Sequence, residues 1–388
     1  MTSSVNATTM PEAKTKNPLQ QLHTFGQSVW LDYIRRDLMT SGELARLISE
    51  DGLRGMTSNP AIFEKAISSS KDYAPYLQEL VKKGGLDATG IYEAIAIRDI
   101  QDAADGLRSV YDQTRGRDGY VSIECNPTLA HKTQETLDEA RRLRKSVGRD
   151  NVMIKVPGTS EGLPAIQQLI SEGINVNITL LFAQDVYGEV AWAYIVGLEE
   201  LARKGGDVSR VASVASFFVS RIDTLVDSKL DAILKTAQSA DEKSLLQSLK
   251  GKVAIANAKL AYQSYENIFS SPRWKALAAR GAKTQRVLWA STGTKNPAYS
   301  DVLYVDELVG PETVNTIPPA TLDAYRDHGR PSSTLQVGVD DARRTMQNLL
   351  KAGIAMRQVT DQLTDEGVKL FEDAFAKLLA AVREKMGS

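Results

Sequence analysis

The segment Asn151-Val-Met-Ile-Lys-Val-Pro157 decides the fold class, because it has the pattern of a strand buried on both faces. Side chains alternate between the two faces of a strand, and here Val152, Met153 and Ile154 make both faces apolar. A Pro-Gly pair follows and predicts a turn directly after the strand. Strands of this kind are typical of parallel sheets in α/β proteins, where helices cover the sheet.

Seven other short apolar runs predict further strands, and helix-like segments such as 129–147 and 183–204 separate them. Together the predicted strands are 29–32, 53–57, 120–125, 152–156, 176–181, 211–216, 287–291 and 314–318. About eight strand–helix units predict an α/β fold, a (β/α)8 TIM barrel with additional helices. A doubly wound sheet is the alternative, but the chain has neither G-x-G-x-x-G after its first strand nor a G-x-x-x-x-G-K-[ST] loop.

The predicted barrel carries extra helices in three places. The stretch 217–282 is too long for one crossover helix, and 60–114 must hold at least two helices with a break at Gly84-Gly85. Further on, apolar residues step by three and four and predict a helix packed on the barrel or its rim; they are Val368, Phe371, Phe375, Leu378 and Val382. We expect a single domain over 17–388, preceded by a flexible polar tail over 1–16.

The composition excludes several classes of protein. Among 388 residues, 47 Lys and Arg balance 48 Asp and Glu, and a net charge of −1 argues against a nucleic-acid-binding or basic membrane-surface protein. Cys125 is the single cysteine, so no intrachain disulfide can form, and three scattered histidines make a Cys/His zinc site unexpected. A magnesium site made of carboxylates alone stays open. The chain has no apolar run long enough to span a membrane, and we expect a cytoplasmic protein.

Lys155 is the first candidate for chemistry, because a lysine inside an apolar strand is uncommon. Burial disfavours the ammonium, and the neutral amine is the nucleophile that condenses with a ketone to form a Schiff base. The turn that follows places Lys155 near the C-terminal end of its strand, where barrel active sites lie. The alternative is a rim lysine whose stem covers apolar surface while its ammonium stays in water.

Two carboxylates end other apolar runs, Asp32 after the first and Glu124 after the third. Parallel strands of a barrel end at the same mouth, so both acids should lie near Lys155. Either acid alone is most simply a hydrogen-bonded residue at a strand end. Two acids and an amine at one mouth can instead move protons during catalysis.

Polar residues from other strand ends can complete this mouth. Asn59 follows the second strand, Ser216 ends the sixth, and Asn177 and Thr179 share one face of the fifth. Arg221 lies shortly beyond Ser216, and the loop Ser291-Thr-Gly-Thr-Lys295 follows the seventh strand, where barrels often bind phosphate. A phosphorylated substrate is therefore suggested, although each residue taken singly is more often a turn residue or a solvated charge.

Six segments together resemble the transaldolase family, and they run across most of the chain. They are Ser28-Val-Trp-Leu-Asp32-Tyr, Met56-Thr-Ser-Asn59-Pro-Ala-Ile-Phe63, Val121-Ser-Ile-Glu124, Met153-Ile-Lys155-Val-Pro157, Gly173-Ile-Asn-Val-Asn177-Ile-Thr179-Leu-Leu-Phe182 and Ala215-Ser216-Phe-Phe218-Val-Ser-Arg221. The segment Trp289-Ala-Ser-Thr-Gly-Thr-Lys295 and the extended length resemble the longer bacterial branch. The resemblance implies a class I barrel enzyme without a metal or an organic cofactor.

The resemblance also implies a role for each site residue. Lys155 matches the Schiff-base lysine and Asp32 the acid/base for carbon–carbon cleavage, while Glu124 matches the group that assists imine formation through a water held with Thr179. Further residues match the binding site for the dihydroxyacetone unit and the phosphate: Asn59, Asn177, Ser216, Phe218 and Arg221. One departure is the absence of a second phosphate-binding arginine after strand seven, where Ser291 and Lys295 stand instead.

The implied reaction belongs to the pentose phosphate pathway and moves dihydroxyacetone from sedoheptulose 7-phosphate to glyceraldehyde 3-phosphate. A related aldolase that uses free dihydroxyacetone is one alternative; that branch has glutamine and tyrosine in place of the residues matching Glu124 and Phe218, which favours transfer here. A catalytically silent barrel that binds sugar phosphate is the other. We expect sugar phosphates as partners, no nucleic acid or membrane, and a monomer or homodimer.

Overall fold

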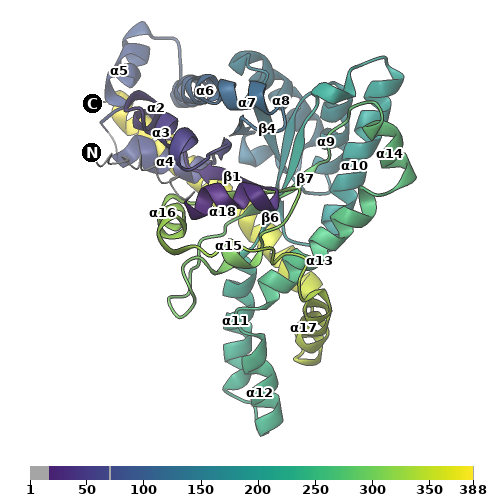
Figure 1. Cartoon of the computed structure of the whole chain (residues 1–388). Helices are drawn as coiled ribbons and strands as arrows, with labels where there is room; N and C mark the ends of the chain where they lie inside the picture. The colour runs from purple at the N-terminus through teal and green to yellow at the C-terminus, as the bar shows by residue number, and fades with distance from the viewer. Residues whose placement is uncertain (1–16, 70, 388) are drawn as a thin grey trace, which may run out of the picture.

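The computed structural model describes residues 17–69 and 71–387, so the tail predicted over 1–16 lies outside the described residues. Eight parallel strands form a closed barrel in which each strand pairs with the next along the chain and β8 pairs with β1 (Figure 1). The strands are β1 (Gln27–Asp32), β2 (Gly55–Thr57), β3 (Tyr120–Glu124), β4 (Val152–Pro157), β5 (Val176–Leu181), β6 (Ser213–Phe218), β7 (Arg286–Ala290) and β8 (Thr313–Ile317). The predicted TIM barrel is confirmed.

The predicted strands overlap the observed ones, and the differences at the second and sixth strands have local causes. The second strand begins later than predicted, because the Leu53 N–H bonds back to Leu47 O (3.0 Å) and so still belongs to the end of helix α3 (Glu43–Glu50). The sixth strand begins and ends later in the sequence than predicted, because Val211 still belongs to the end of the short turn η3 (Val208–Arg210). Phe217 and Phe218, which were not predicted in the strand, pair with β7 instead.

Helices follow the strands and cover the barrel from outside. Between β1 and β5 they are α2 (Arg36–Thr40), α3, α4 (Pro60–Ser69), α5 (Ala74–Lys83), α6 (Ala88–Gly106), α7 (Arg108–Gln113), η2 (Pro127–Leu129), α8 (Thr133–Val147) and α9 (Gly162–Ser171). α1 (Pro18–Leu22) and η1 (His23–Phe25) precede the barrel, and α10 (Gln184–Arg203) follows β5. The predicted break in 60–114 is confirmed, since Gly84 and Gly85 separate α5 from α6.

The long stretch after β6 holds several helices, as predicted. They are α11 (Ser220–Leu234), α12 (Ala240–Leu249), α13 (Val253–Ile268) and α14 (Pro272–Ala278), and after β7 come α15 (Leu303–Glu307), α16 (Pro319–His328), α17 (Val339–Lys351) and α18 (Met356–Gly387). Figure 1 shows α11 and α12 projecting from the barrel next to α17. No helix of the described residues is both long and apolar enough to cross a membrane.

Helix α18 lies across the barrel and contacts α4, α6, α11 and β5. In Figure 1 it runs diagonally from the side of α17 to that of α5. All five residues of the predicted apolar stripe, including Phe371, are buried, so the prediction of a helix packed on the barrel is confirmed. Gly367 permits the close approach to β5, because a Cβ at this position would lie 2.9 Å from the Leu180 side chain.

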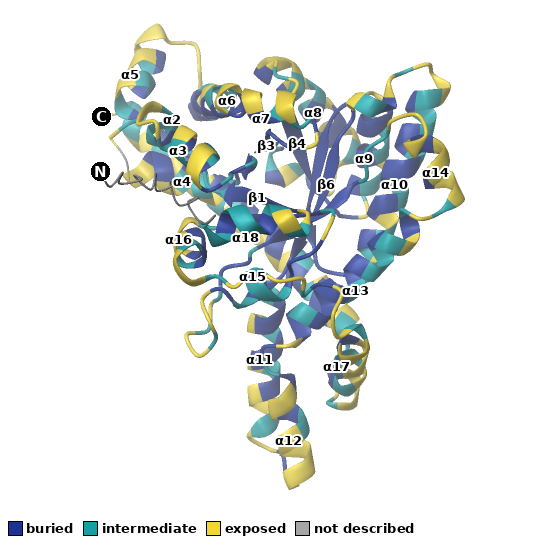
Figure 2. Ribbon diagram, in the orientation of Figure 1, coloured by how far each residue is buried: buried dark blue, intermediate teal, exposed yellow. Residues whose placement is uncertain are grey.

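A buried ion pair fills the N-terminal end of the barrel. Arg286 begins β7 and binds Asp118, with 2.8 Å between Nη2 and Oδ1, and its other nitrogen donates to Ser28 Oγ (2.8 Å). Trp30 Nε1 also donates to Asp118 (3.2 Å). Figure 2 shows the strands as a buried interior. Since the N-terminal end is filled by this network, the opposite end is the place for a binding site.

Candidate active site

Lys155 lies near the end of β4 and points into the C-terminal end of the barrel. β4 pairs with β3 and β5 so that Glu124, Lys155 and Asn177 stand at the same level. The Lys155 ammonium donates a hydrogen bond to Ser58 O (3.1 Å) and lies 3.4 Å from Glu124 Oε2. Lys155 is only 5% exposed, which excludes the alternative of a rim lysine with its ammonium in water.

A cavity of about 250 Å³ opens above this lysine. Its lining consists of Asp32, Thr57, Asn59, Lys155, Thr179, Ser216, Phe218, Arg221, Ala290, Ser291, Lys295, Thr316, Pro318 and Phe371. Nine of the eleven predicted site residues are in this lining. The other two, Glu124 and Asn177, lie on the strands on either side of Lys155 at its level.

Asp32 ends β1 and is held by a chain of hydroxyl groups. Thr57 Oγ1 donates to Asp32 Oδ1 (2.7 Å) and lies 2.7 Å from Thr316 Oγ1. Because a hydroxyl has one proton, Thr316 must donate to Thr57 when Thr57 donates to Asp32. Burial raises the pKa of Asp32, and the charge of Lys155 and the Thr57 hydrogen bond oppose this increase. Asp32 can therefore accept and return a proton more readily than an exposed aspartate could.

Glu124 is the second acid next to Lys155, and its side chain is 4% exposed. Burial raises the pKa of Glu124, Lys155 opposes the increase, and the charge of Asp32 adds to it. Among the described residues, the Glu124 carboxylate oxygens and Thr179 Oγ1 make no hydrogen bond. These buried atoms retain the capacity to bind a hydroxyl group or a water molecule.

Asn177 is fixed by its neighbours below the cavity. Its Nδ2 donates to Ser122 Oγ (3.0 Å), and its Oδ1 accepts a hydrogen bond from Ser216 Oγ (2.7 Å). Asn59 Oδ1 accepts from the Ile62 N–H (3.0 Å) at the start of α4. Both asparagine side chains are thereby oriented, and Asn59 lines the cavity while Asn177 holds Ser216 in place.

The cavity lining also carries two further positive charges, Arg221 and Lys295. Arg221 opens helix α11 and lies over the Phe218 ring, with 5.3 Å between the guanidinium carbon and the ring centroid. Burial lowers the pKa of Arg221. Ser291, which also lines the cavity, has a left-handed backbone with φ of 56°. Strain of this kind is found where surrounding structure enforces it, often at functional sites.

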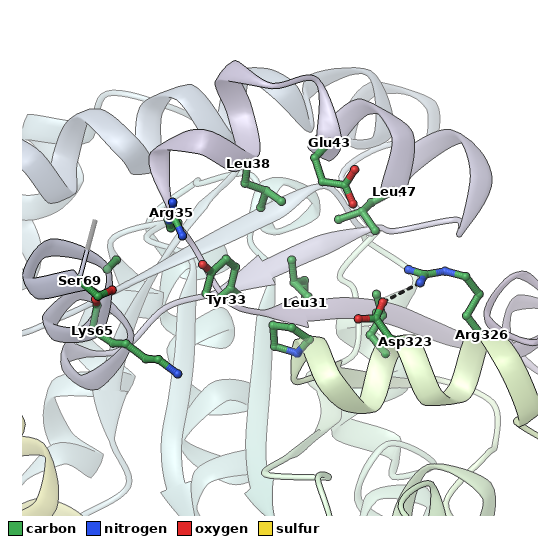
Figure 3. Close-up of a pocket in the computed structure, with 13 residues that line it drawn as sticks. Leu31, Tyr33, Arg35, Leu38, Glu43, Leu47, Lys65, Ser69, Asp323 and Arg326 are labelled. Carbon is green, nitrogen blue, oxygen red and sulfur yellow. Dashed lines mark hydrogen bonds and ion pairs between the residues drawn. The ribbon is translucent and has the colours of Figure 1, made fainter. Parts of the chain in front are cut away.

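A second and larger cavity, of about 390 Å³, lies outside β1 and shares no residue with the first (Figure 3). Its arginines already have carboxylate partners: Arg35 binds Asp72 (2.8 Å), and Arg326 binds Asp51 (2.7 Å). Its lysine, Lys65, is exposed. These features do not provide the buried amine that imine chemistry needs. Within residues 17–69 and 71–387, no group of His, Cys, Asp or Glu is arranged to hold a metal ion.

The comparisons with known proteins agree with this geometry. The family model described as transaldolase/fructose-6-phosphate aldolase matches residues 29–382. The chain belongs to this family. It is 50% identical to a transaldolase of Trichodesmium erythraeum over 95% of this chain and 98% of that protein. It is also 50% identical to transaldolase 2 of a Nostoc species (95% and 98%) and 47% identical to a transaldolase of Thiobacillus denitrificans (94% and 99%).

Five residues of this family member line the cavity although the sequence did not single them out as site residues: Thr57, Ala290, Thr316, Pro318 and Phe371. Thr57 and Thr316 support Asp32, and the Phe371 ring centroid of α18 lies 6.0 Å from Lys155 Nζ. Thr57 stands in the Thr-Ser-Asn-Pro segment, which was a usable signal. The apolar stripe around Phe371 indicated a buried face, but a stripe does not tell which element covers it.

Proposed function

We propose that the protein is a transaldolase that transfers a dihydroxyacetone unit from sedoheptulose 7-phosphate to glyceraldehyde 3-phosphate. The products are erythrose 4-phosphate and fructose 6-phosphate. The observation that carries the proposal is the buried amine of Lys155 in a cavity that also holds the Asp32 carboxylate and the cations Arg221 and Lys295. The transaldolases at about 50% identity support the same activity.

The first stage of the proposed mechanism joins the ketose to Lys155. The free amine attacks the carbonyl carbon, which gives a carbinolamine after proton transfer. Glu124, through a water molecule held with Thr179, supplies the proton with which the hydroxyl leaves as water, and an iminium ion remains. Burial raises the pKa of Glu124, which makes this carboxyl a better proton carrier than an exposed glutamate.

The second stage breaks and remakes a carbon–carbon bond. Asp32 removes the proton from the hydroxyl next to the breaking bond, the aldose product leaves, and the bonding electrons enter the iminium to form an enamine. The enamine then attacks the acceptor aldehyde, and Asp32 returns the proton to the new hydroxyl. Water finally hydrolyses the iminium and releases the new ketose. Asn59 and Ser216, which line the cavity, hold the three-carbon unit between these steps, and Asn177 contributes by orienting Ser216.

Transfer requires that the enamine is not protonated by water before the acceptor arrives. Phe218 and Phe371, 7% and 6% exposed, supply apolar walls of the cavity, with Phe371 close to the Lys155 amine. These rings limit the access of water to the enamine carbon. Arg221, Ser291 and Lys295 bind the phosphate group of the acceptor, and this contact keeps the acceptor aligned with the enamine.

The decisive experiment traps the imine with borohydride in the presence of fructose 6-phosphate. We expect a reduced sugar adduct at Lys155 by peptide mass mapping and none at Lys65, the exposed lysine of the second cavity. Turnover is then measured with and without an aldehyde acceptor. Acceptor-dependent turnover supports transfer, whereas equally fast release of free dihydroxyacetone would identify an aldolase. A protein that forms no adduct and shows no turnover would be a silent sugar-phosphate-binding barrel.

Lys295→Ala should weaken binding of phosphorylated acceptors. We expect about a tenfold increase in KM for glyceraldehyde 3-phosphate, at the low end for a charged hydrogen bond because Lys295 is exposed. The KM for unphosphorylated glyceraldehyde should change less than twofold. Lys295→Arg, which keeps the charge, is the matched control and should retain most of the affinity. Equal increases for both acceptors would remove Lys295 from the phosphate site.

A further inference from the structure

Two buried carboxylates on α11, Asp223 and Asp227, have no part in the proposed chemistry. They lie one helical turn apart on the helix that begins with Ser220 and Arg221, and they are 1% and 7% exposed. Carboxylates are rarely buried unless they have hydrogen-bond or charge partners. Their partners therefore indicate what this face of the helix holds.

Each carboxylate binds one tyrosine and one backbone N–H. Asp223 accepts hydrogen bonds from the Tyr304 hydroxyl (2.9 Å) and the Ala254 N–H (2.8 Å). Asp227 accepts from the Tyr299 hydroxyl (2.6 Å) and the Gly251 N–H (3.1 Å). We call these four side chains the α11 clamp: Asp223, Asp227, Tyr299 and Tyr304.

The clamp joins two segments that are distant in sequence. Ala254 lies in the first turn of α13 and Gly251 in the turn just before it, within the stretch of helices inserted after β6. The two tyrosines follow β7. The contact between Tyr299 and Gly251 is close, since a Cβ on Gly251 would lie 2.8 Å from Tyr299 Cζ, and Gly251 has φ of 68°. Both the lack of room for a Cβ and the positive φ favour glycine at position 251. The Tyr299 ring can therefore pack directly against the backbone of the inserted helices.

The same helix also holds the other end of the loop after β7. The Ser220 N–H donates to Ser291 O (3.1 Å), and the Ser220 and Ser291 hydroxyl oxygens are 3.0 Å apart. Within the loop, Thr294 Oγ1 donates to Ser300 O (2.8 Å). Lys295 therefore lies in a loop that α11 anchors on both sides, at Ser291 before it and at Tyr299 after it.

We propose that the α11 clamp positions the loop 291–302 and thereby sets the affinity of the site for the phosphate group of its substrates. Arg221 stands on α11 itself, and Lys295 stands on the loop that α11 holds, so the clamp fixes the separation of the two cations. Lysine needs such support, because its ammonium sits on a flexible stem and lacks the fork of an arginine. The inference rests on the proposed function and assigns the inserted helices a role in it.

Tyr299→Phe tests the clamp, because it removes one hydroxyl and keeps the ring against Gly251. We expect KM for glyceraldehyde 3-phosphate to rise about three- to tenfold, the scale of a typical net hydrogen bond. KM for unphosphorylated glyceraldehyde and kcat should change less than twofold. Tyr194→Phe is the matched control, since this hydroxyl also donates to a distant oxygen, Lys283 O (2.7 Å), and should leave both KM values unchanged. A purely structural defect would shift both acceptors equally and would overturn the inference.

A double-mutant cycle with Lys295→Ala sharpens the test. If Tyr299 acts by positioning Lys295, then Tyr299→Phe should change KM for glyceraldehyde 3-phosphate less than twofold once Lys295 is alanine. Independent, multiplicative effects would contradict the inference. Borohydride trapping with fructose 6-phosphate in the wild-type protein separates failure of the proposed function from failure of the clamp proposal. Absence of an adduct at Lys155 contradicts the proposed function. A normal adduct together with no selective KM effect of Tyr299→Phe contradicts the role of the clamp alone.

Discussion

Lys155→Ala is expected to abolish turnover, with a loss of about 10⁴-fold or more, the scale for removing a covalent nucleophile. The reason is that the imine supplies the electron sink for carbon–carbon cleavage, and the cavity lining offers no other lysine than the exposed Lys295. Turnover is measured as acceptor-dependent consumption of fructose 6-phosphate. The borohydride adduct should disappear in the same variant.

Folding of the variant must be checked separately, because the substitution leaves Ser58 O and Glu124 without the ammonium that they contact. Lys155→Met is the better matched variant, since it keeps most of the volume and replaces a buried charge by an apolar group. We expect a folded protein with equally low activity and a Tm somewhat below that of the wild type, because Glu124 loses its buried cation. Turnover within tenfold of the wild type in a folded Lys155→Met protein would refute the lysine mechanism.

Asp32→Asn should slow carbon–carbon cleavage by about 10²- to 10⁴-fold, the range for a lost general acid/base. Asparagine keeps an oxygen that can accept the Thr57 hydrogen bond but cannot take up the hydroxyl proton. Imine formation does not use Asp32, so the adduct at Lys155 should still form to at least about half of the wild-type yield. Single-turnover kinetics with fructose 6-phosphate separate the two steps.

The pH dependence gives a second readout for Asp32. Burial raises the pKa of this aspartate, and the base must be ionised to act, so wild-type kcat should fall as the pH decreases through a value above that of an ordinary aspartate. Asp323→Asn, in the second cavity, is the control and should leave the pH profile unchanged.

For the substitution itself, a loss of trapping in Asp32→Asn as severe as the loss of turnover would contradict the role assigned to Asp32.

The barrel could be predicted from the sequence because several of its strands, such as 152–156, are apolar on both faces. Such a strand has few alternatives to a parallel sheet covered by helices, and the eight short runs then imply the closed form. The same topology explains why the sequence could predict that Asp32, Glu124 and Lys155 lie close together. Residues at the C-terminal ends of parallel barrel strands meet at one mouth, whatever their separation in sequence.

Partners outside the strands could not be predicted in this way. The stripe that includes Phe371 indicated burial, but its position over Lys155 depends on the path of α18 across the barrel. Likewise, Asp223 and Asp227 look like ordinary helix residues until α13 and the loop after β7 are seen to pack against α11. Which residues pack against each other depends on the tertiary fold, and the spacing of apolar residues along the sequence does not specify it.

The place of Phe371 on α18 has a consequence for biosynthesis. The ribosome makes Lys155 early and Phe371 late, after β8 (Thr313–Ile317) has left the peptidyl transferase centre. A nascent chain can thus complete all eight strands before Phe371 covers one side of the Lys155 cavity. The apolar wall beside the nucleophile therefore comes from a part of the chain that is synthesised after the barrel strands.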